Sequence, residues 1–527
     1  MQFDVIVVGG GHNGLVCSCY LAAAGLSVCV LERHGEVGGA AITETFHPGF
    51  RNSTASYTVS LLQQKIIADL GLLDKGLRIL RRPLDNFVPG LNGPGLELSG
   101  ERAARLAAIA AHSRADAERY AGYLDELALL TRLLKPLLLE PPLDPSGDWR
   151  ERWRCLKELW RFGGGSARQW SVIWQLLTGS AGDWLDRHFE TDLLKGGLGF
   201  DSIVGHFASP YEPGSTYLLL HHALGQVDGA EGAWGHAVGG MGAITQTLAR
   251  VARERGVTIE TDAAVDSIVP AGRGFEVAVG TRRLGARVVA AAIHPQTLFL
   301  DLLEGVELPA DFRERIVHWR SESASLRVNV ALSELPDFKC LPGRKPGPHH
   351  GAGILVAPSL DYLDRAHRDA RASGYSPEPV IELVIPSTID ATLAPRGTHV
   401  ASLFCQHFRR HLPDGVRWLD SKAAALERIV ATVDDYAPNF RASIIALEAY
   451  TPEELEQRFG LVGGDIFHGS MHLDQLYWSR PAWGYAQYRM PVEGLYLCAS
   501  GAHPGGGVSG APGHNAARAI LEDLGRA

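Results

Sequence analysis

Three glycine residues near the start of the chain have the spacing needed to hold a phosphate group. Gly9, Gly11 and Gly14 form a Gly-x-Gly-x-x-Gly turn directly after the apolar run Val5-Ile6-Val7-Val8. The first glycine permits a tight turn, the second lets the backbone approach a pyrophosphate, and the third lets a helix pack closely on the preceding strand. This spacing predicts that a dinucleotide binds at a helix N-terminus, where free N–H groups attract anions.

The flanking residues supply the elements that must position this turn. The apolar run predicts a buried strand, residues 15–24 a helix that ends at Gly25, and residues 27–31 a second strand. Glu32 follows, about 20 residues after the turn, where a carboxylate accepts hydrogen bonds from ribose hydroxyls and repels a 2′-phosphate. Together these features predict a Rossmann-like domain whose dinucleotide is not NADP.

A second glycine pair, Gly38-Gly39, follows the acid after a short spacer. At this point the chain resembles the FAD-dependent amine oxidase and phytoene desaturase superfamily, in which an acid, a spacer and Gly-Gly continue the contact with the cofactor. The resemblance implies FAD as the cofactor, contacted by Gly9, Gly11, Gly14, Glu32, Arg33, Gly38, Gly39 and Ala40. Ala40 stands where many members carry arginine.

Two later segments extend the resemblance. Residues 234–242 are a glycine-rich loop before a predicted helix at 243–254, and residues 500–513 are another before a predicted helix at 514–524. In the superfamily both regions return to the FAD domain, which implies the following further contacts: Gly240, Met241, Val265, Ser500, Gly501, Gly507, Val508 and Ser509. The positive end of the last helix would face the flavin ring and stabilise the charge of reduced flavin.

Over nearly its whole length the chain looks like a phytoene desaturase-like flavoprotein, in particular the branch that contains pyridine nucleotide-disulphide oxidoreductase domain-containing protein 2. That similarity rests on Gly10-Gly11-His12-Asn13-Gly14-Leu15, Ala55-Ser56-Tyr57, Phe467-His468-Gly469 and Arg480-Pro481. It implies an α/β fold: a Rossmann-like FAD-binding domain of the glutathione reductase type, with an inserted α+β substrate domain of antiparallel sheet plus helices. We expect residues 1–100, 225–300 and 485–527 in the FAD-binding domain, and 101–224 and 301–484 in the substrate domain.

The composition excludes several other classes of protein. A chain of 527 residues is long enough for two or three domains, and its net charge of −9 argues against nucleic-acid binding. The seven cysteines include no Cys-x-x-Cys pair, which argues against a disulfide reductase and favours a reducing compartment. No run of about 18 apolar residues occurs, and the fingerprint begins at residue 4. We therefore expect a cytoplasmic protein.

Histidine and tryptophan residues in the middle of the chain are less specific. His206, His221 and His222 lack the spacing and the carboxylate neighbours of a metal site, so we expect no metal. Six tryptophans are interleaved with arginines: Trp149, Trp153, Trp160, Trp170, Trp174 and Trp184. We favour a helical cap whose tryptophans fill its own core. The alternatives are an amphipathic surface in peripheral contact with a membrane, where Trp and Arg both anchor, and an apolar tunnel that opens toward lipid.

The predicted function is FAD-dependent chemistry at a C–C bond of an apolar, isoprenoid or lipid-like substrate, by dehydrogenation, saturation or flavin-assisted isomerisation. The flavin performs the hydride chemistry and the protein orients the substrate. The polar residues expected near the ring are His503, Tyr57 and His294, in falling order. Dioxygen or a quinone is the expected electron acceptor, because no second nucleotide fingerprint occurs.

Two other functions stay open. A flavin amine oxidase would have an aromatic cage at the flavin face and would release peroxide when amines are added. A FAD-stabilised interaction protein would bind the flavin without turnover. The oligomeric state is open as well.

Overall fold

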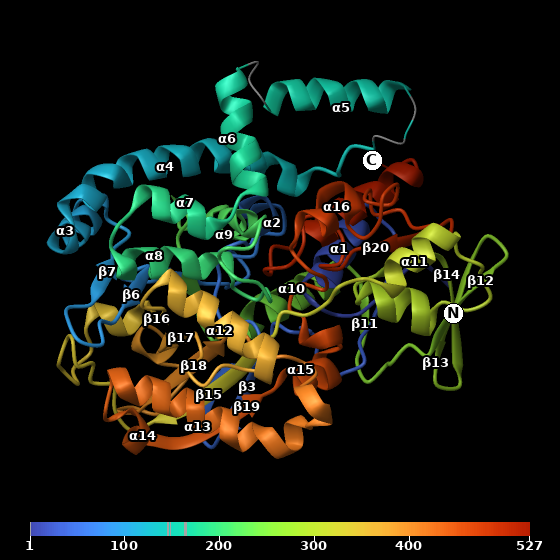
Figure 1. Cartoon of the computed structure of the whole chain (residues 1–527). Coiled ribbons are helices and arrows are strands. Elements are labelled where there is room, and N and C mark those ends of the chain that lie inside the picture. Colours follow the sequence, from blue (N-terminus) through green and yellow to red (C-terminus); the bar gives the residue numbers. More distant parts are fainter. Residues whose placement is uncertain (1, 145–146, 148, 163–165, 527) are drawn as a thin grey trace.

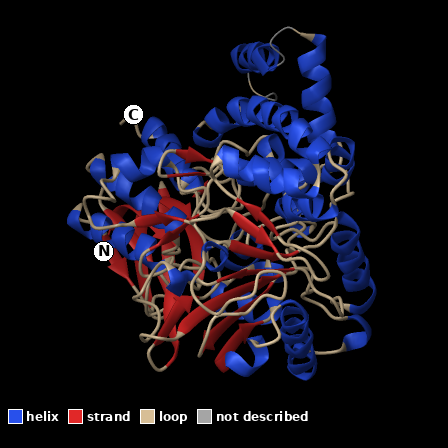
Figure 2. Cartoon of the chain, turned by 90° about the vertical axis from the view of Figure 1, so that its left-hand side faces the viewer, coloured by secondary structure: helices blue, strands red, loops and turns tan. Residues whose placement is uncertain are grey.

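The computed structural model describes residues 2–144, 147, 149–162 and 166–526, and its two largest β-sheets each have a hydrophobic core of their own. Helices surround the strands on the outside of the molecule (Figures 1 and 2). The sheets meet at the candidate site.

The first sheet combines strands from both ends and the middle of the chain, in the order β11-β2-β1-β14-β13-β12, with β20 also paired to β14. These strands are β1 (Gln2–Val8), β2 (Val28–Leu31), β11 (Thr258–Glu260), β12 (Ser267–Ala271), β13 (Gly274–Val279), β14 (Arg282–Ala291) and β20 (Leu495–Leu497). β1 pairs in parallel with β2 and β14, and β14 pairs in parallel with β20. The carboxyl ends of these strands therefore meet at one edge.

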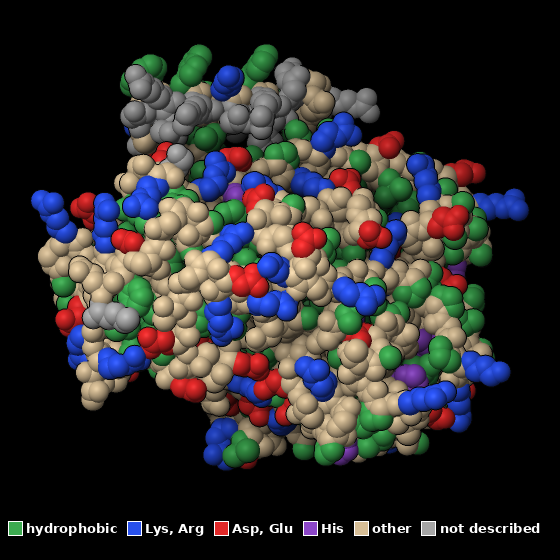
Figure 3. Space-filling model, turned by 180° about the vertical axis from the view of Figure 1, so that it is seen from behind, with side chains coloured by type: hydrophobic (Ala, Val, Ile, Leu, Met, Phe, Trp, Pro, Cys, Tyr) green, Lys and Arg blue, Asp and Glu red, His purple; other side chains and the backbone are tan. Residues whose placement is uncertain are grey.

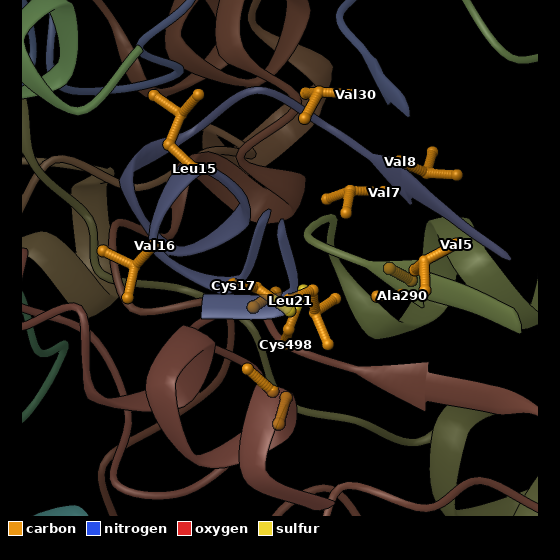
Figure 4. Close-up of a cluster of buried hydrophobic side chains, with 14 of the residues drawn as sticks. Val5, Val7, Val8, Leu15, Val16, Cys17, Leu21, Val30, Ala290 and Cys498 are labelled. Carbon is orange, nitrogen blue, oxygen red and sulfur yellow. The ribbon is translucent and has the colours of Figure 1, made fainter. Parts of the chain in front are cut away.

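The predicted strand–helix–strand unit is confirmed. The helix is α1 (His12–Ala23), which packs against α10 (Gly242–Glu254) and α16 (Ala511–Asp523). Figure 4 shows the core between α1 and the strands, where apolar side chains of β1 and β2 meet Ala290 of β14 and Cys17 approaches Cys498. Every residue from Val5 to Val8 is buried, as a parallel strand covered on both faces requires.

The second sheet has the order β19-β15-β18-β17-β16-β6-β7, and all its pairs are antiparallel except β16 with β6. Its strands are β6 (Asn86–Val88), β7 (Leu96–Leu98), β15 (Leu326–Leu332), β16 (Gly353–Val356), β17 (Ile381–Val384), β18 (His399–Cys405) and β19 (Ile444–Tyr450). The strand predicted at residues 326–332 is confirmed as β15. Buried residues of α12 (Leu360–Ser373) and α13 (Trp418–Tyr436) belong to its core.

Helices from the second quarter of the chain pack at one end of this core. They are α3 (Arg102–His112), α4 (Arg114–Leu134), α5 (Trp149–Phe162), α6 (Ala167–Thr178), α7 (Ala181–His188), α8 (Asp192–Gly199) and α9 (Ser215–Ala223), with a 3₁₀ turn at Lys135–Leu139. The remaining elements are α2 (Gln64–Asp69), α11 (Ala310–Val317), α14 (Phe440–Ser443), α15 (Pro452–Phe459), β3 (Thr43–His47), β4 (Phe50–Ser53), β5 (Ile79–Arg81), β8 (Gln226–Val227), β9 (Ala230–Glu231) and β10 (Gly235–Ala237).

Two expectations from the sequence are corrected. The first segment of the FAD-binding domain cannot extend to residue 100, because β6 and β7 join the second sheet through β16. The tryptophans do not fill a core of their own: Trp184 is 1% exposed, but Trp149, Trp153, Trp160 and Trp174 are 72%, 66%, 74% and 70% exposed. These four lie on α5 and α6, at the top of the molecule in Figure 1.

In the described part of the chain, every helix is too short or too polar to cross a lipid bilayer.

Candidate functional site: a dinucleotide cradle beside an apolar cavity

The two N-terminal glycine turns pack directly on each other at the carboxyl end of β1. The Gly38 N–H donates to the Gly10 carbonyl over 2.9 Å, and Gly11 and Gly38 form an isolated parallel bridge. A Cβ added to Gly39 would lie 3.3 Å from the Gly11 Cα. The two segments that were predicted to contact the cofactor therefore form one site.

The fold of the turn requires Gly9 and Gly14 but does not require Gly11. Gly9 has a φ of 100°, and a Cβ on Gly14 would lie 2.2 Å from the Gly9 carbonyl oxygen. Gly11 has an ordinary extended conformation, with φ −68° and ψ 171°, and a Cβ there would meet no described atom within 4 Å. A glycine that the packing of the protein does not need fits the position where a pyrophosphate approaches the backbone.

Glu32 is buried and holds the same turn. Its Oε2 accepts a hydrogen bond from the Gly10 N–H at 2.8 Å, and its Oε1 accepts one from the His34 N–H at 3.0 Å. A carboxylate oxygen accepts more than one hydrogen bond, so Glu32 keeps the capacity to bind ribose hydroxyls. The neighbouring Arg33 donates to the Arg458 carbonyl at 2.8 Å, at the end of α15. Its predicted contact with the cofactor stays a prediction.

The C-terminal loop reaches this site because β20 pairs with β14. The Asn13 amide Nδ2 donates to Ser500 Oγ at 3.3 Å, and a Cβ on Gly513 would lie 2.1 Å from the Asn13 carbonyl oxygen. The first turns of α1 and α16 are therefore in direct contact. Helix N-termini present free N–H groups and partial positive charge, so both ends favour an anionic ligand.

Residues 500–509 are held in a tightly constrained path. A Cβ on Gly501 would lie 2.4 Å from Pro295, and one on Gly507 would lie 2.4 Å from Leu61. Val508 has a φ of 56°, which is unfavourable for a β-branched residue. The adjacent Ser509 carbonyl accepts the Gln63 N–H at 3.1 Å. Strain of this kind persists only where the surroundings enforce it, as at a ligand site.

Arg480 fixes the start of this loop. Its guanidinium is fully buried and donates to the Ser500 carbonyl at 2.8 and 3.0 Å and to the Phe467 carbonyl at 2.7 Å. Burial lowers the pKa of Arg480 to about 10, so it stays charged at neutral pH. The Arg480-Pro481 motif carried part of the family resemblance, and the structure gives its arginine this positioning role.

A cavity lies where these segments meet the second sheet. Its lining comes from both glycine turns, the C-terminal loop and the second sheet: His12, Ala40, Ala41, Ala55, Ser56, Tyr57, Thr58, Ser60, Leu61, Val204, His222, Trp234, Phe404, Ile466, Phe467, Ser500, Gly507 and Val508. Among these described lining residues, none is Lys, Arg, Asp or Glu. The cavity therefore presents apolar and aromatic groups with a few hydroxyls.

The polar atoms at this place fit a bound dinucleotide. His12 Nε2 and Asn13 Oδ1 are buried without a hydrogen-bond partner at the start of α1. Burial lowers the pKa of His12 to about 4, so its ring is neutral at pH 7. Unpartnered buried polar atoms are costly unless a ligand or water completes them. The glycine turns would hold the pyrophosphate and Glu32 a ribose.

Tyr57 lines the cavity, where it was predicted to lie. Its hydroxyl donates to Glu382, and its ring stacks on Phe404 with centroids 5.2 Å apart and planes 23° apart. Glu382 is also 3.1 Å from Arg82, and both side chains are buried. Burial, together with the Glu382 carboxylate, raises the pKa of Tyr57 well above its usual value. Tyr57 is therefore a protonated donor at neutral pH.

His503 and His294 are not among the described residues that line the cavity. His503 Nε2 donates to the Leu137 carbonyl at 2.8 Å, and burial lowers the pKa of the ring to about 4. His294 Nε2 lies 2.9 Å from Ser321 Oγ, and burial lowers its pKa well below the usual value. The hydrogen bonds of both rings hold loops in place, so their predicted position in contact with the flavin is not supported.

The remaining predicted contacts lie farther along the same region. Gly240 packs on the β3–β4 hairpin, where a Cβ would lie 2.3 Å from Thr43 Oγ1, and the Met241 N–H donates to Ser53 Oγ at 2.9 Å. Val265 follows β11, whose neighbouring residue Ala263 donates its N–H to the Glu32 carbonyl at 2.8 Å. These positions neighbour the turns, and direct contact with the cofactor stays a prediction.

Three residues of the second sheet were missed from the sequence: Arg327, Glu382 and Phe404. A signal was present for two of them, because Arg327 and Glu382 are single charged residues inside strands that are otherwise apolar or uncharged. A charge in a buried strand calls for a partner or a function.

Known proteins share this arrangement. The NAD(P)-binding Rossmann-like domain family matches residues 7–67. The chain is 39% identical over 545 residues to the mouse (Mus musculus) pyridine nucleotide-disulfide oxidoreductase domain-containing protein 2, covering 99% of this chain and 94% of the relative. It is 26% identical to a limonene dehydrogenase polypeptide of Castellaniella defragrans, covering 99% and 95%. It is 24% identical to a lycopene-forming phytoene desaturase of Pseudescherichia vulneris, covering 98% and 99%.

A solved structure has the same fold. The structure of a putrescine oxidase triple mutant superposes with a TM-score of 0.62 at 17% identity, covering 100% of this chain and 99% of that one. The resemblance inferred from the glycine motifs is thereby confirmed. The chain belongs to the family of pyridine nucleotide-disulfide oxidoreductase domain-containing protein 2, within the phytoene desaturase and amine oxidase superfamily of oxidoreductases.

Proposed function

We propose that the protein is a FAD-dependent oxidoreductase that acts on a C–C bond of an apolar, isoprenoid or lipid-like substrate. The observation that carries this proposal is the cavity: it joins the dinucleotide cradle to the second sheet, and its described lining has no charged side chain. Apolar pockets with a few polar groups bind apolar ligands through area removed from water. Two relatives, named for limonene and phytoene, act on hydrocarbons by name.

The chain itself would supply binding and orientation. FAD, when bound, supplies the hydride chemistry. The glycine turns hold the pyrophosphate, and the first turn of α16 presents positive charge where reduced flavin carries negative charge. Leu61, Phe404 and Ile466 would exclude water from the substrate. Tyr57 remains a hydrogen-bond donor rather than a base, so a reaction that needs little acid–base assistance suits the site.

The two sheets would correspond to two domains. We assign the first sheet, with α1, α10 and α16, to a FAD-binding domain of the glutathione reductase type. The second sheet and its helices would form an inserted substrate domain. Electrons would pass to dioxygen or a quinone, since the described chain carries one dinucleotide fingerprint.

The geometry is less favourable to an amine oxidase. In an aromatic cage the substrate passes between two rings, which needs a separation of roughly 7 Å, about twice the contact distance of carbon atoms. The Tyr57 and Phe404 centroids are 5.2 Å apart, so these rings fill the space between them. A flavin-stabilised interaction protein without turnover is the third candidate.

We also propose that α5 and α6 contact an anionic lipid surface. On α5 the exposed residues Trp153, Leu156 and Trp160 share one face of the helix, and Trp174 on α6 is also exposed. The α5 sequence has five basic and two acidic residues, in a chain whose net charge is −9. Hydrophobic side chains project from this edge in Figure 3. A basic helix with tryptophans suits an anionic membrane interface, from which an apolar substrate could be drawn.

The test is anaerobic reduction of the FAD-loaded protein by candidate substrates. Limonene-like and longer isoprenoid hydrocarbons are compared with aliphatic amines, and bleaching of the flavin absorbance is followed. Bleaching by a hydrocarbon, with reoxidation by quinone or dioxygen, supports the proposal. Bleaching by amines alone, with peroxide release, would assign the protein to the amine oxidases. A photoreduced flavin that no acceptor reoxidises would favour the interaction protein.

A further inference from the structure

Arg327 lies on the face of the second sheet that borders the cavity. In β15 it is the direct cross-strand neighbour of Phe404 in β18, which in turn neighbours Glu382 in β17. Directly opposed residues in a sheet point to the same face. Phe404 lines the cavity, so Arg327 and Glu382 point toward the same side of the sheet.

Residues that line the cavity surround the guanidinium group. Its Cζ is 4.3 Å from the centroid of the Tyr57 ring and 5.3 Å from that of Phe404. On its other side the cross-strand neighbour is Tyr450, which shares an apolar cluster with the lining residue Ala55. Arg327 is 1% exposed to solvent.

The hydrogen-bonding capacity of Arg327 is largely unused. Nη2 donates to Ser402 Oγ at 2.5 Å, whereas Nε and Nη1 have no partner among the described residues. These two nitrogens carry three N–H donors, and arginine has no acceptor atom that could be satisfied instead. The rings of Tyr57 and Phe404 attract the cation through their faces, but they do not accept three hydrogen bonds.

The positive charge also lacks a dedicated counter-charge among the described residues. The nearby carboxylate of Glu382 is committed to Arg82 at 3.1 Å and to the Tyr57 hydroxyl. Burial lowers the pKa of Arg327 to about 10, which leaves it protonated at neutral pH. The described groups around Tyr57 therefore contain two guanidinium charges and one paired carboxylate, which leaves one positive charge uncompensated. A buried, unpaired charge is costly, and a bound monoanion would compensate it.

We propose that Arg327 binds the carboxylate of an amphipathic substrate, an unsaturated carboxylic acid whose apolar body occupies the cavity. Guanidinium recognises carboxylate through strong, charge-assisted hydrogen bonds. A carboxylate suits the site better than a phosphate dianion, because a single uncompensated charge is available and the described cavity lining adds no Lys or Arg. The choice of substrate class rests on the proposed function, but the binding site itself does not.

The experiment measures binding without turnover. Oleate and geranate are each titrated against their methyl esters, and the dissociation constant is followed by intrinsic fluorescence and by the flavin spectrum of the oxidised holoprotein. We expect the wild-type protein to bind each acid at least about 10-fold more tightly than its ester, the effect of one charge-assisted hydrogen bond. Arg327→Gln should bring this ratio to within about 2-fold and leave the affinity for the esters unchanged.

Arg327→Lys serves as a second variant in case the glutamine variant folds poorly. It keeps the charge and loses the planar fork, so it should retain part of the preference for the acid. Equal affinities for acid and ester in the wild type, an undiminished acid preference in Arg327→Gln, or failure of both acids to bind at millimolar concentration would overturn the proposal. Because no step requires oxidation, a protein that binds the acids but never reduces its flavin would contradict the proposed function alone.

Discussion

Replacing Gly11 with alanine should separate cofactor binding from folding. In the protein alone, a Cβ at this position meets no described atom within 4 Å, and the φ of −68° is one that alanine adopts freely. The variant should therefore fold with wild-type stability. If a pyrophosphate lies over Gly11, however, the methyl group occupies the space that the phosphate needs.

The magnitude follows from contact distances. A backbone N–H donates to a phosphate oxygen at about 2.9 Å, whereas a methyl carbon keeps an atom at roughly 3.5 Å or more. The methyl group would therefore lengthen at least one hydrogen bond beyond its useful range. A hydrogen bond to a charged group contributes about 1.5–3 kcal/mol, so the dissociation constant for FAD should rise by about 10- to 150-fold.

The assay is titration of the apoprotein with FAD, followed by flavin fluorescence, alongside thermal unfolding of the apoprotein. Gly14→Ala is the contrasting variant, since its Cβ would lie 2.2 Å from the Gly9 carbonyl oxygen and should lower both stability and affinity. Gly122→Ala, in α4 with open space around it, is the matched control and should change neither FAD binding nor folding adversely. Wild-type FAD affinity in Gly11→Ala would refute the placement of the pyrophosphate, and a loss of stability without FAD would refute the packing argument.

Three further outcomes are expected. The folded-state pKa of His503 is about 4 against an ordinary 6.5, so the folded protein resists protonation there and loses stability as the pH falls from 6.5 to 4; His503→Gln should make that loss shallower by up to about 1.4 kcal/mol per pH unit in acid unfolding curves. Arg480→Met should lower the free energy of unfolding by about 3 kcal/mol or more and weaken FAD binding, because it removes the donors to the Ser500 carbonyl; unchanged denaturant midpoints would count against this role. Trp153→Ala with Trp160→Ala should reduce sedimentation with phosphatidylglycerol vesicles, whereas Trp483→Ala, 55% exposed and outside α5, should not; equal losses would contradict a lipid-binding role of α5.

Local signals in the sequence were sufficient for the first sheet and its cradle. The Val5–Val8 run, the glycine spacing and Glu32 are contiguous, and each residue has one physical role, so β1, α1 and β2 follow within a few residues. The helix was predicted to start at residue 15 but starts at His12, because the Gly-x-x-Gly segment is itself the first turn.

The second sheet shows what local signals cannot supply. β6 and β7 have three residues each, too few to establish a period, and their membership depends on pairing with β16 more than 250 residues away. The tryptophans of α5 were wrongly assigned to a core because amphipathic spacing identifies an apolar face but not what covers it.

His503 shows the same limit at the level of a site. Its position in the C-terminal glycine loop follows from the motif, but the direction of the ring depends on the Leu137 carbonyl, 366 residues away. The Tyr57–Glu382 contact likewise joins residues 325 apart. Such pairs carry no spacing signal, and only the folded chain brings them together.

The pairing of β14 explains why three distant segments form one site. The carboxyl-terminal half of β14 has β1 on one side and β20 on the other, all parallel, so the glycine turn after β1, the chain after Ala291 and the loop after Leu497 leave the sheet at the same edge. Ligands in open α/β sheets bind outside this edge, where helix N-termini are directed. The second sheet then closes the other side with Phe404, Glu382 and Arg327. The cradle is thus a consequence of strand order, while the chemical selectivity of the cavity depends on which side chains the second sheet contributes.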